Sequence, residues 1–256
     1  MILVTGASGT LGGFLVPALT ARGAEVRALS RRRHASDAAG RDTWVIGDLV
    51  NGAGLDEALE GVDAIVHAAT DSRRLGKGDT AAAWHLIEAA KRGGRRPHLV
   101  FISIVGVDRH PLPPYRIKYE AEQAIERSGL PHTILRSTQF FQLFDMLLSA
   151  AAKSPVLPVP SVPFQPLDAA EAAEHLADAA LGEPRGRAAD VGGPEVLDTG
   201  AIARSWLRAT GKRRLLLPLR VPGKSGRAFR AGVHTTPDNR QGKTTWAEFL
   251  AAKYGA

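Results

Sequence analysis

Apolar residues in the first half of the chain alternate between short continuous runs and a helical spacing. Residues 1–5 form an apolar run with β-branched side chains, which is typical of a buried strand. Apolar residues then recur at Leu11, Leu15, Ala18 and Leu19, a spacing that predicts a helix. Further patterns predict strands over residues 25–30, 43–47, 62–67, 98–103 and 132–136, and helices over residues 79–92 and 114–128.

Strands that alternate with helices in this way predict an α/β fold with a doubly wound parallel sheet, the Rossmann class. The regularity weakens after residue 153, because residues 154–166 contain five prolines and read as a linker or a loop. Asp168 can then cap a helix over residues 168–181. We therefore expect a dinucleotide-binding core over residues 1–153 and a smaller substrate-side region over residues 154–256, with the helix at 168–181 able to pack back on the core.

A glycine-rich turn joins the first strand to the first helix, with the spacing Gly6-x-x-Gly9-x-x-Gly12. Gly6 permits the tight turn, Gly9 lets the backbone approach a pyrophosphate, and Gly12 lets the helix pack close to the strand. The free N–H groups and the positive dipole end of the helix favour phosphate binding. The expected cofactor contacts of this turn are Gly6, Ser8, Gly9, Thr10, Leu11 and Gly12.

The end of the second strand indicates which dinucleotide is bound. Enzymes that prefer NAD usually place an acidic residue there to bind the ribose 2′-hydroxyl. This chain instead has Ser30-Arg31-Arg32, followed by Arg33, and guanidinium groups can pair with a 2′-phosphate. The sequence therefore predicts NADP(H). After the third strand, Asp48 either accepts a hydrogen bond from the adenine amino group or caps a turn.

The composition excludes several classes of site. The chain has no cysteine, which excludes disulfides, thiol nucleophiles and cysteine-ligated metal clusters. No apolar run is long enough to cross a bilayer, and the first strand leaves no room for a targeting segment. The histidines show no metal-ligand spacing, so no metal site is expected. We expect a cytoplasmic protein without a membrane partner.

The net charge of +7 is concentrated in one window. Residues 204–243 contain eleven Lys or Arg residues and a single acid, Asp238. The favoured interpretation is a solvated basic surface. The alternative is a site for an anionic substrate, a phosphate tail or an acidic protein partner. Nucleic acid is poorly supported, because no interleaved aromatic pattern or DNA-reading motif accompanies the charge.

Several motifs resemble those of the short-chain dehydrogenase/reductases, namely residues 5–12, 30–32, 47–49 and 67–70. Residues 101–108 and 134–140 narrow the resemblance to the atypical, NmrA-like branch of that superfamily. The resemblance covers about residues 1–195. It implies NADP(H) binding, with Asp48, Leu49, Ala68, Ala69 and Thr70 along the cofactor and the segment from Thr138 to Phe140 near the nicotinamide.

The catalytic residues of that superfamily are a serine and a Tyr-x-x-x-Lys pair on the next helix, and this chain departs from the pattern. Ser103 ends the fifth strand, and Tyr115 and Lys118 follow with the spacing Tyr-x-x-Lys. Pro114 stands where the tyrosine is usual, and it has no proton to give. Three residues along a helix still share a side, so Tyr115 can lie near Lys118. The candidate catalytic residues are Tyr115, Lys118 and Ser103, and the alternative for Tyr115 is a packing role.

The resulting hypothesis is an NADP(H)-dependent oxidoreductase that acts on a small organic substrate with a carbonyl group or a conjugated double bond. The main alternative is a non-catalytic NADP(H)-sensing regulator of the NmrA-like type, which acts through a protein partner. A third is an isomerase or epimerase with a tightly held cofactor. The substrate and the oligomeric state stay open.

Overall fold

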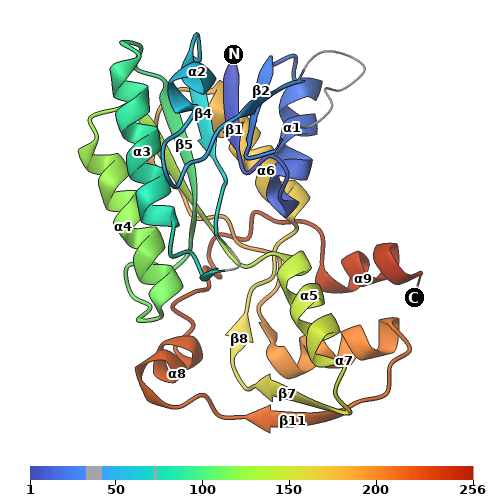
Figure 1. Cartoon of the computed structure of the whole chain (residues 1–256). Helices are drawn as coiled ribbons and strands as arrows, with labels where there is room; N and C mark the ends of the chain where they lie inside the picture. The colour runs from blue at the N-terminus through green and yellow to red at the C-terminus, as the bar shows by residue number, and fades with distance from the viewer. Residues whose placement is uncertain (33–41, 72–73, 256) are drawn as a thin grey trace. The chain divides into compact units, whose positions relative to one another are not determined.

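The computed structural model describes residues 1–32, 42–71 and 74–255. Arg33 lies outside these described residues. The chain divides into two compact units, which are described separately (Figure 1). Unit 1 comprises Met1–Ser103, Pro113–Arg136 and Ala173–Ala189, and unit 2 comprises Ile104–Leu112, Ser137–Ala172 and Asp190–Ala256. The units interleave along the chain, in contrast to the single boundary after residue 153 that the sequence suggests.

Unit 1 is built on a parallel sheet, which has seven strands in the part of the chain that the structure describes. The strand order is β3-β2-β1-β4-β5-β6-β9. The strands are β1 (Ile2–Thr5), β2 (Val26–Ser30), β3 (Asp42–Ile46), β4 (Ala64–His67), β5 (His98–Ile104), β6 (His132–Ser137) and β9 (Gly186–Arg187). This order and the parallel pairing confirm the doubly wound α/β fold, and β1 to β6 lie within two residues of their predicted bounds.

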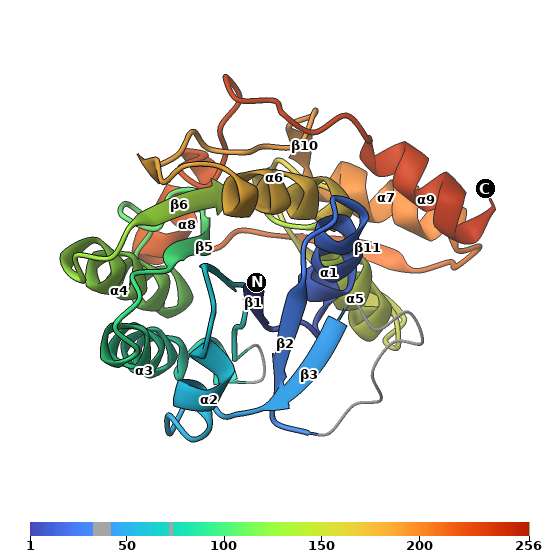
Figure 2. The same cartoon turned by 90° about the horizontal axis from the view of Figure 1, so that it is seen from above.

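Helices cover both faces of this sheet, because its strands alternate apolar side chains above and below (Figure 2). On one face Leu3, Ile65 and Phe101 pack with buried residues of the helices α2, α3 and α4. On the other face α1 pairs with α6 through Arg22, which contacts Glu174 and Asp178. The helices are α1 (Thr10–Ala21), α2 (Leu55–Leu59), α3 (Asp79–Arg92), α4 (Pro113–Arg127) and α6 (Ala169–Leu181).

Unit 2 contains shorter and less regular elements. Its helices are α5 (Phe141–Ala151), α7 (Thr199–Ala209), α8 (Gly223–Arg230) and α9 (Trp246–Tyr254), and its strands are β7 (Val156–Pro160), β8 (Pro163–Phe164), β10 (Leu197–Asp198) and β11 (Leu215–Leu219). β8 pairs with β10 antiparallel, and β7 pairs with β11 parallel. The core centres on Trp206, whose indole nitrogen donates to Asp145 at 2.7 Å.

The proline-rich segment at 154–166 is not simply the loop that its composition suggests. It contains β7 and β8. Pro158 and Pro160 are tolerated in β7 because that strand belongs to a sheet of two strands, so one of its edges needs no hydrogen bonds. Within the described residues, no helix is both long enough and apolar enough to cross a membrane.

Candidate functional site

The carboxyl ends of β1 and β4 meet where the strand order of the unit 1 sheet reverses. Thr5 is in register with His67, so the turns that follow the two strands lie side by side. A Cβ atom on Gly6 would lie only 2.7 Å from the backbone nitrogen of Ala69. Ligands of doubly wound sheets bind beyond the strand ends at this reversal, which makes it the candidate site.

The glycine turn has the tight geometry that its sequence predicts. Gly6 has a φ of +74°, a conformation that L side chains rarely adopt, and its carbonyl accepts from the Gly9 N–H at 2.9 Å. A Cβ on Gly12 would meet the Gly6 oxygen at 2.2 Å, so only glycine fits there. Around Gly9, by contrast, the Gly6 oxygen at 3.2 Å is the only described protein atom that a Cβ would meet within 4 Å.

The outer side of this turn is open to a ligand. Ser8, Gly9 and Thr10 are exposed, whereas Leu11 and Gly12 are buried against the strand. Gly9 caps α1 without a side-chain hydrogen bond, and the first N–H groups of a helix have no partner inside it. These donors and the absent Cβ of Gly9 fit a pyrophosphate.

Among the described residues, the end of β2 presents two cations and no carboxylate. Arg31 and Arg32 are exposed, and the Arg32 N–H donates to the hydroxyl oxygen of Ser30 at 3.2 Å. This bond bends the chain directly after the strand. The two guanidinium groups can pair with a 2′-phosphate. No acidic side chain among the described residues at this strand end can accept a hydrogen bond from a ribose 2′-hydroxyl.

Asp48 caps a turn, as one of the two sequence-based interpretations expects. Its Oδ1 accepts from the Val50 N–H at 2.8 Å. Leu49 is partly buried against the core, and its carbonyl lies 3.0 Å from Nδ1 of His85. The contact of Asp48 with adenine and the contact of Leu49 with the cofactor stay predictions.

The segment after β4 is held by Asp79, which the sequence analysis missed as a site residue. Ala69 donates its N–H to the Thr5 hydroxyl at 3.4 Å. The Thr70 hydroxyl donates to Oδ2 of Asp79, and the Asp71 N–H donates to Oδ1 at 2.8 Å. Asp79 is buried in the first turn of α3. The only signal in the sequence was an acidic residue at a predicted helix start. Acidic residues are common at helix N-termini, so this signal did not single out Asp79.

Lys118 reaches the same carboxylate from α4. Its Nζ lies 3.3 Å from Oδ2 of Asp79 and 4.8 Å from the ring centre of Phe101. Burial lowers the pKa of Lys118, and the nearby Asp79 opposes that shift. The structure therefore places a buried cation at the carboxyl ends of β4 and β5.

His67 is a buried neighbour of this cation. Its Nδ1 lies 2.7 Å from the Thr5 hydroxyl, and its ring stacks on Phe101 with the ring centres 5.4 Å apart. Nε2 has no hydrogen-bond partner among the described residues. Burial, together with the charge of Lys118, lowers the pKa of His67 to about 3, so the ring is neutral near neutral pH.

Ser103 and Tyr115 are both buried. Ser103 follows Phe101 by two residues on β5, so both side chains leave the same face of the sheet. The Ser103 hydroxyl makes no hydrogen bond within the described part of the chain, which leaves a buried donor for a ligand. α4 begins at Pro113, which puts Tyr115 in its first turn and Lys118 three residues later.

Two expected cofactor contacts, Thr138 and Phe140, belong to unit 2. The Thr138 hydroxyl accepts from the Gly193 N–H at 3.3 Å, and Phe140 forms a parallel bridge with Leu167. Their contact with the nicotinamide stays a prediction.

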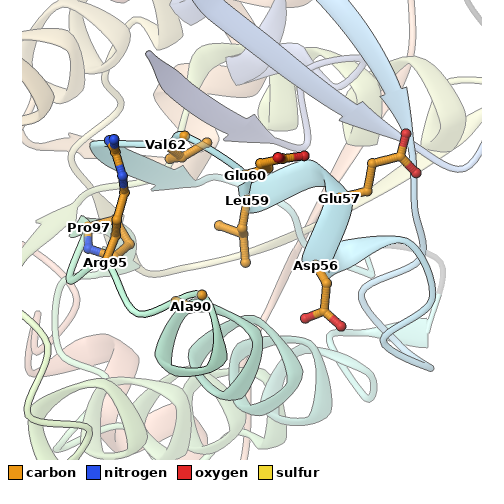
Figure 3. Close-up of a pocket in the computed structure, with 10 residues that line it drawn as sticks. Asp56, Glu57, Leu59, Glu60, Val62, Ala90, Arg95 and Pro97 are labelled. Atoms are coloured by element: carbon orange, nitrogen blue, oxygen red, sulfur yellow. The ribbon is translucent and has the colours of Figure 1, made fainter.

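A hollow in unit 1, of about 540 Å³, lies away from the site residues of that unit, near the amino end of β4 (Figure 3). Its lining includes Asp56, Glu57 and Glu60 of the α2 region and Arg95. Doubly wound sheets bind their ligands beyond the carboxyl ends of the strands, so this hollow is not the candidate site.

Comparison with known proteins supports the interpretation of this site. The family described as NAD(P)H-binding matches residues 6–142. A (4-alkanoyl-5-oxo-2,5-dihydrofuran-3-yl)methyl phosphate reductase of Streptomyces griseus is 36% identical over 143 residues, which are 55% of this chain and 48% of that protein. A photosystem II assembly factor of Cyanophora paradoxa is 33% identical over 150 residues, which are 55% of this chain and 46% of that protein. The chain thus spans about half the length of these relatives.

One solved structure shares the fold over almost the whole chain. It is an NADPH-dependent quinone oxidoreductase of Escherichia coli in complex with NADPH, with a TM-score of 0.81 and 20% identity over 99% of this chain and 100% of that one. The family match confirms a nicotinamide dinucleotide as the cofactor, and with the shared fold it confirms the resemblance to atypical short-chain dehydrogenase/reductases.

Proposed function

Because the chain belongs to the NAD(P)H-binding family, we propose that it is an NADPH-dependent reductase of a small organic compound with a carbonyl group or a conjugated double bond. The observation that carries the proposal is the buried Ser103 hydroxyl, which has no hydrogen-bond partner among the described residues. Ser103 lies on β5, two residues after Phe101, and the ammonium group of Lys118 lies over the Phe101 ring. Such an unpaired buried donor costs stability unless a ligand uses it.

Each part of the cofactor has a matching part of unit 1. The pyrophosphate fits the turn from Gly6 to Gly12, and the 2′-phosphate fits Arg31 and Arg32. Lys118 donates to the nicotinamide ribose, and Asp79 fixes the position of its ammonium group. Lys118→Ala is therefore expected to weaken NADPH binding while the fold stays intact.

When bound, NADPH supplies a hydride. The Ser103 hydroxyl donates a hydrogen bond to the substrate carbonyl, and Tyr115 supplies the proton that the reduced product needs. Ser103→Ala is expected to reduce turnover more than cofactor affinity.

A second function, sensing of NADP(H) without catalysis, is favoured by one feature. Pro114 occupies the position at which the superfamily has its tyrosine, so proton transfer depends on a residue one position away. The relative named as a photosystem II assembly factor fits a role that works through protein partners. The cytoplasmic location remains a prediction, and the oligomeric state stays open.

The test is a substrate screen with full-length protein, in which NADPH consumption is followed by absorbance and products are identified. The names of the similar proteins make quinones and unsaturated lactones the first compounds to try. The reductase predicts slow NADPH-dependent reduction that Tyr115→Phe abolishes. Tight NADPH binding without any turnover favours the sensor, and turnover that survives in Tyr115→Phe excludes Tyr115 as the proton donor.

A further inference from the structure

The sheet of β7 and β11 in unit 2 is apolar on both faces. Leu157 and Val159 of β7 and Leu216 of β11 face the core around Trp206. The opposite face, which we call the outer face, consists of Val156, Pro158, Pro160, Leu215, Leu217 and Leu219, because parallel strands in register point their side chains the same way. A strand pair with one covered face normally carries polar side chains on the other.

The outer face is open to solvent. Leu215 is 67% exposed, Leu217 48% and Leu219 43%. Pro158 is also exposed, and Val156 and Pro160 are half-buried. Three leucines in alternate positions of one strand form a row that is partly exposed along its whole length, and such contiguous apolar surface marks an interaction site.

Cations flank this leucine row on both sides along the chain. Lys212 and Arg213 precede β11, and Arg220, Lys224 and Arg227 follow it on the way into α8 (Figure 1). All five side chains are exposed, and none forms an ion pair with a described residue. The sequence contains no carboxylate from residue 199 to residue 237. The charge is therefore not neutralised within this region.

We propose that the outer face and its flanking cations adsorb to an anionic lipid surface. Interfacial binding combines apolar side chains at the acyl boundary with Lys and Arg at the headgroups, and a leucine row between basic flanks has that order. A second copy fits less well, because like charges would meet across the interface. The sequence predicts no membrane partner because it has no spanning segment, but adsorption requires none.

The test is co-sedimentation of the full chain with vesicles. We expect binding to vesicles of phosphatidylcholine mixed with phosphatidylglycerol, weaker binding at high salt, and little binding to phosphatidylcholine alone. Leu217→Ser should lower the partition coefficient about ten-fold. Arg220→Glu should lower it by about ten-fold as well, since it removes one cation and adds an anion.

Two variants are matched controls. Leu181 at the end of α6 is 50% exposed, a fraction similar to the 48% of Leu217. It does not belong to the outer face, so Leu181→Ser should leave vesicle binding unchanged. Arg127 is exposed in the last turn of α4, and Arg127→Glu makes the same charge change as Arg220→Glu. Equal binding to neutral vesicles, no binding to anionic ones, or equal effects of the variants and their controls would overturn the proposal. So would a dimer in sedimentation velocity that Leu217→Ser dissociates.

Discussion

Two buried ion pairs begin from the same helix, α4, but differ in geometry and surroundings. Glu122 accepts two hydrogen bonds from Arg136, at 2.8 and 2.6 Å, and both side chains are at most 3% exposed. Lys118, one turn earlier, lies 3.3 Å from Asp79, and their side chains are 9% and 4% exposed. The Glu122 pair is bidentate and short, whereas the Lys118 pair is a single, longer contact.

The difference indicates a division of tasks along one helix. Arg136 lies on β6, so the Glu122 pair fastens α4 to the sheet. Asp79, in contrast, also binds Thr70 and the Asp71 N–H, and its partner Lys118 lies over the Phe101 ring. A looser pair among other polar groups can exchange part of its contacts for a ligand, which a bidentate buried pair cannot do without a large cost.

The largest expected effect is on stability when one partner of the bidentate pair is changed. Glu122→Gln removes the carboxylate that accepts two short hydrogen bonds from the buried Arg136, and we expect the free energy of unfolding to fall by about 3–5 kcal/mol. Asp79→Asn should cost about 1–3 kcal/mol, because Lys118, whose pKa burial already lowers, can release its proton. Urea unfolding measures both variants. Equal losses of unfolding free energy in the two variants would contradict the proposed difference between the two ion pairs.

The surroundings of Lys118 should also respond to acid. Burial lowers the pKa of His67 from 6.5 to about 3, so below pH 6.5 the unfolded chain takes up a proton that the folded chain does not bind. Stability should therefore fall by about 1.4 kcal/mol per pH unit as the pH drops from 6.5 toward 3. Unfolding free energies at several pH values should show a shallower dependence in His67→Gln. Superimposable pH profiles would rule out His67 as the acid-sensitive group.

Adjacent glycines show the same contrast between fixed and open surroundings. A Cβ on Gly12 would lie 2.2 Å from the Gly6 oxygen, so Gly12→Ala should cost about 1–3 kcal/mol of stability and weaken cofactor binding. Apart from its chain neighbours and the backbone of its own helix, Gly13 has no described atom within 4 Å of its Cβ position. Gly13→Ala should therefore stabilise the exposed helix by up to about 1 kcal/mol. Thermal unfolding of the two variants compares them directly. Tolerance of alanine at both positions would contradict the tight turn.

The smallest expected effect concerns Arg31 and Arg32 after β2. Both are exposed, whereas Arg136 is buried in its pair with Glu122. Arg31→Ala and Arg32→Ala should each weaken NADPH binding by about ten-fold and leave NADH binding unchanged, because NADH has no 2′-phosphate. Fluorescence titration with both cofactors measures this, with Arg127→Ala as an exposed arginine control on α4. Wild-type protein that binds NADH as tightly as NADPH would refute the role of these arginines.

The sequence predicted unit 1 well and unit 2 poorly for a physical reason. A parallel sheet buries whole strands, so β1 to β6 stand out as apolar runs between helices of regular spacing. In unit 2, β8 and β10 are only two residues long, and β7 carries two prolines. Such strands exist because of their pairing and packing, which local patterns do not reveal.

The candidate site shows the same limit. Gly6 and Gly12 were predictable because each has a steric reason that spacing encodes, and Lys118 was proposed as a site residue from the resemblance. Asp79 and the Glu122–Arg136 pair were not predicted as partners. Asp79 is thirty-nine residues from Lys118 in sequence, and only the packing of α3 against α4 brings them together. Contacts of this range require the tertiary structure.

The most direct test of the proposed reductase is hydride transfer from labelled cofactor. NADPH deuterated at one or the other hydrogen of the nicotinamide C4 carbon is supplied with a compound that the screen identifies, and the product is examined by mass spectrometry. The account predicts that deuterium from only one of the two labelled cofactors enters the product, and that Tyr115→Phe suppresses the reaction. Product without deuterium from either cofactor, or no product from any quinone or unsaturated lactone despite NADPH binding, would contradict it.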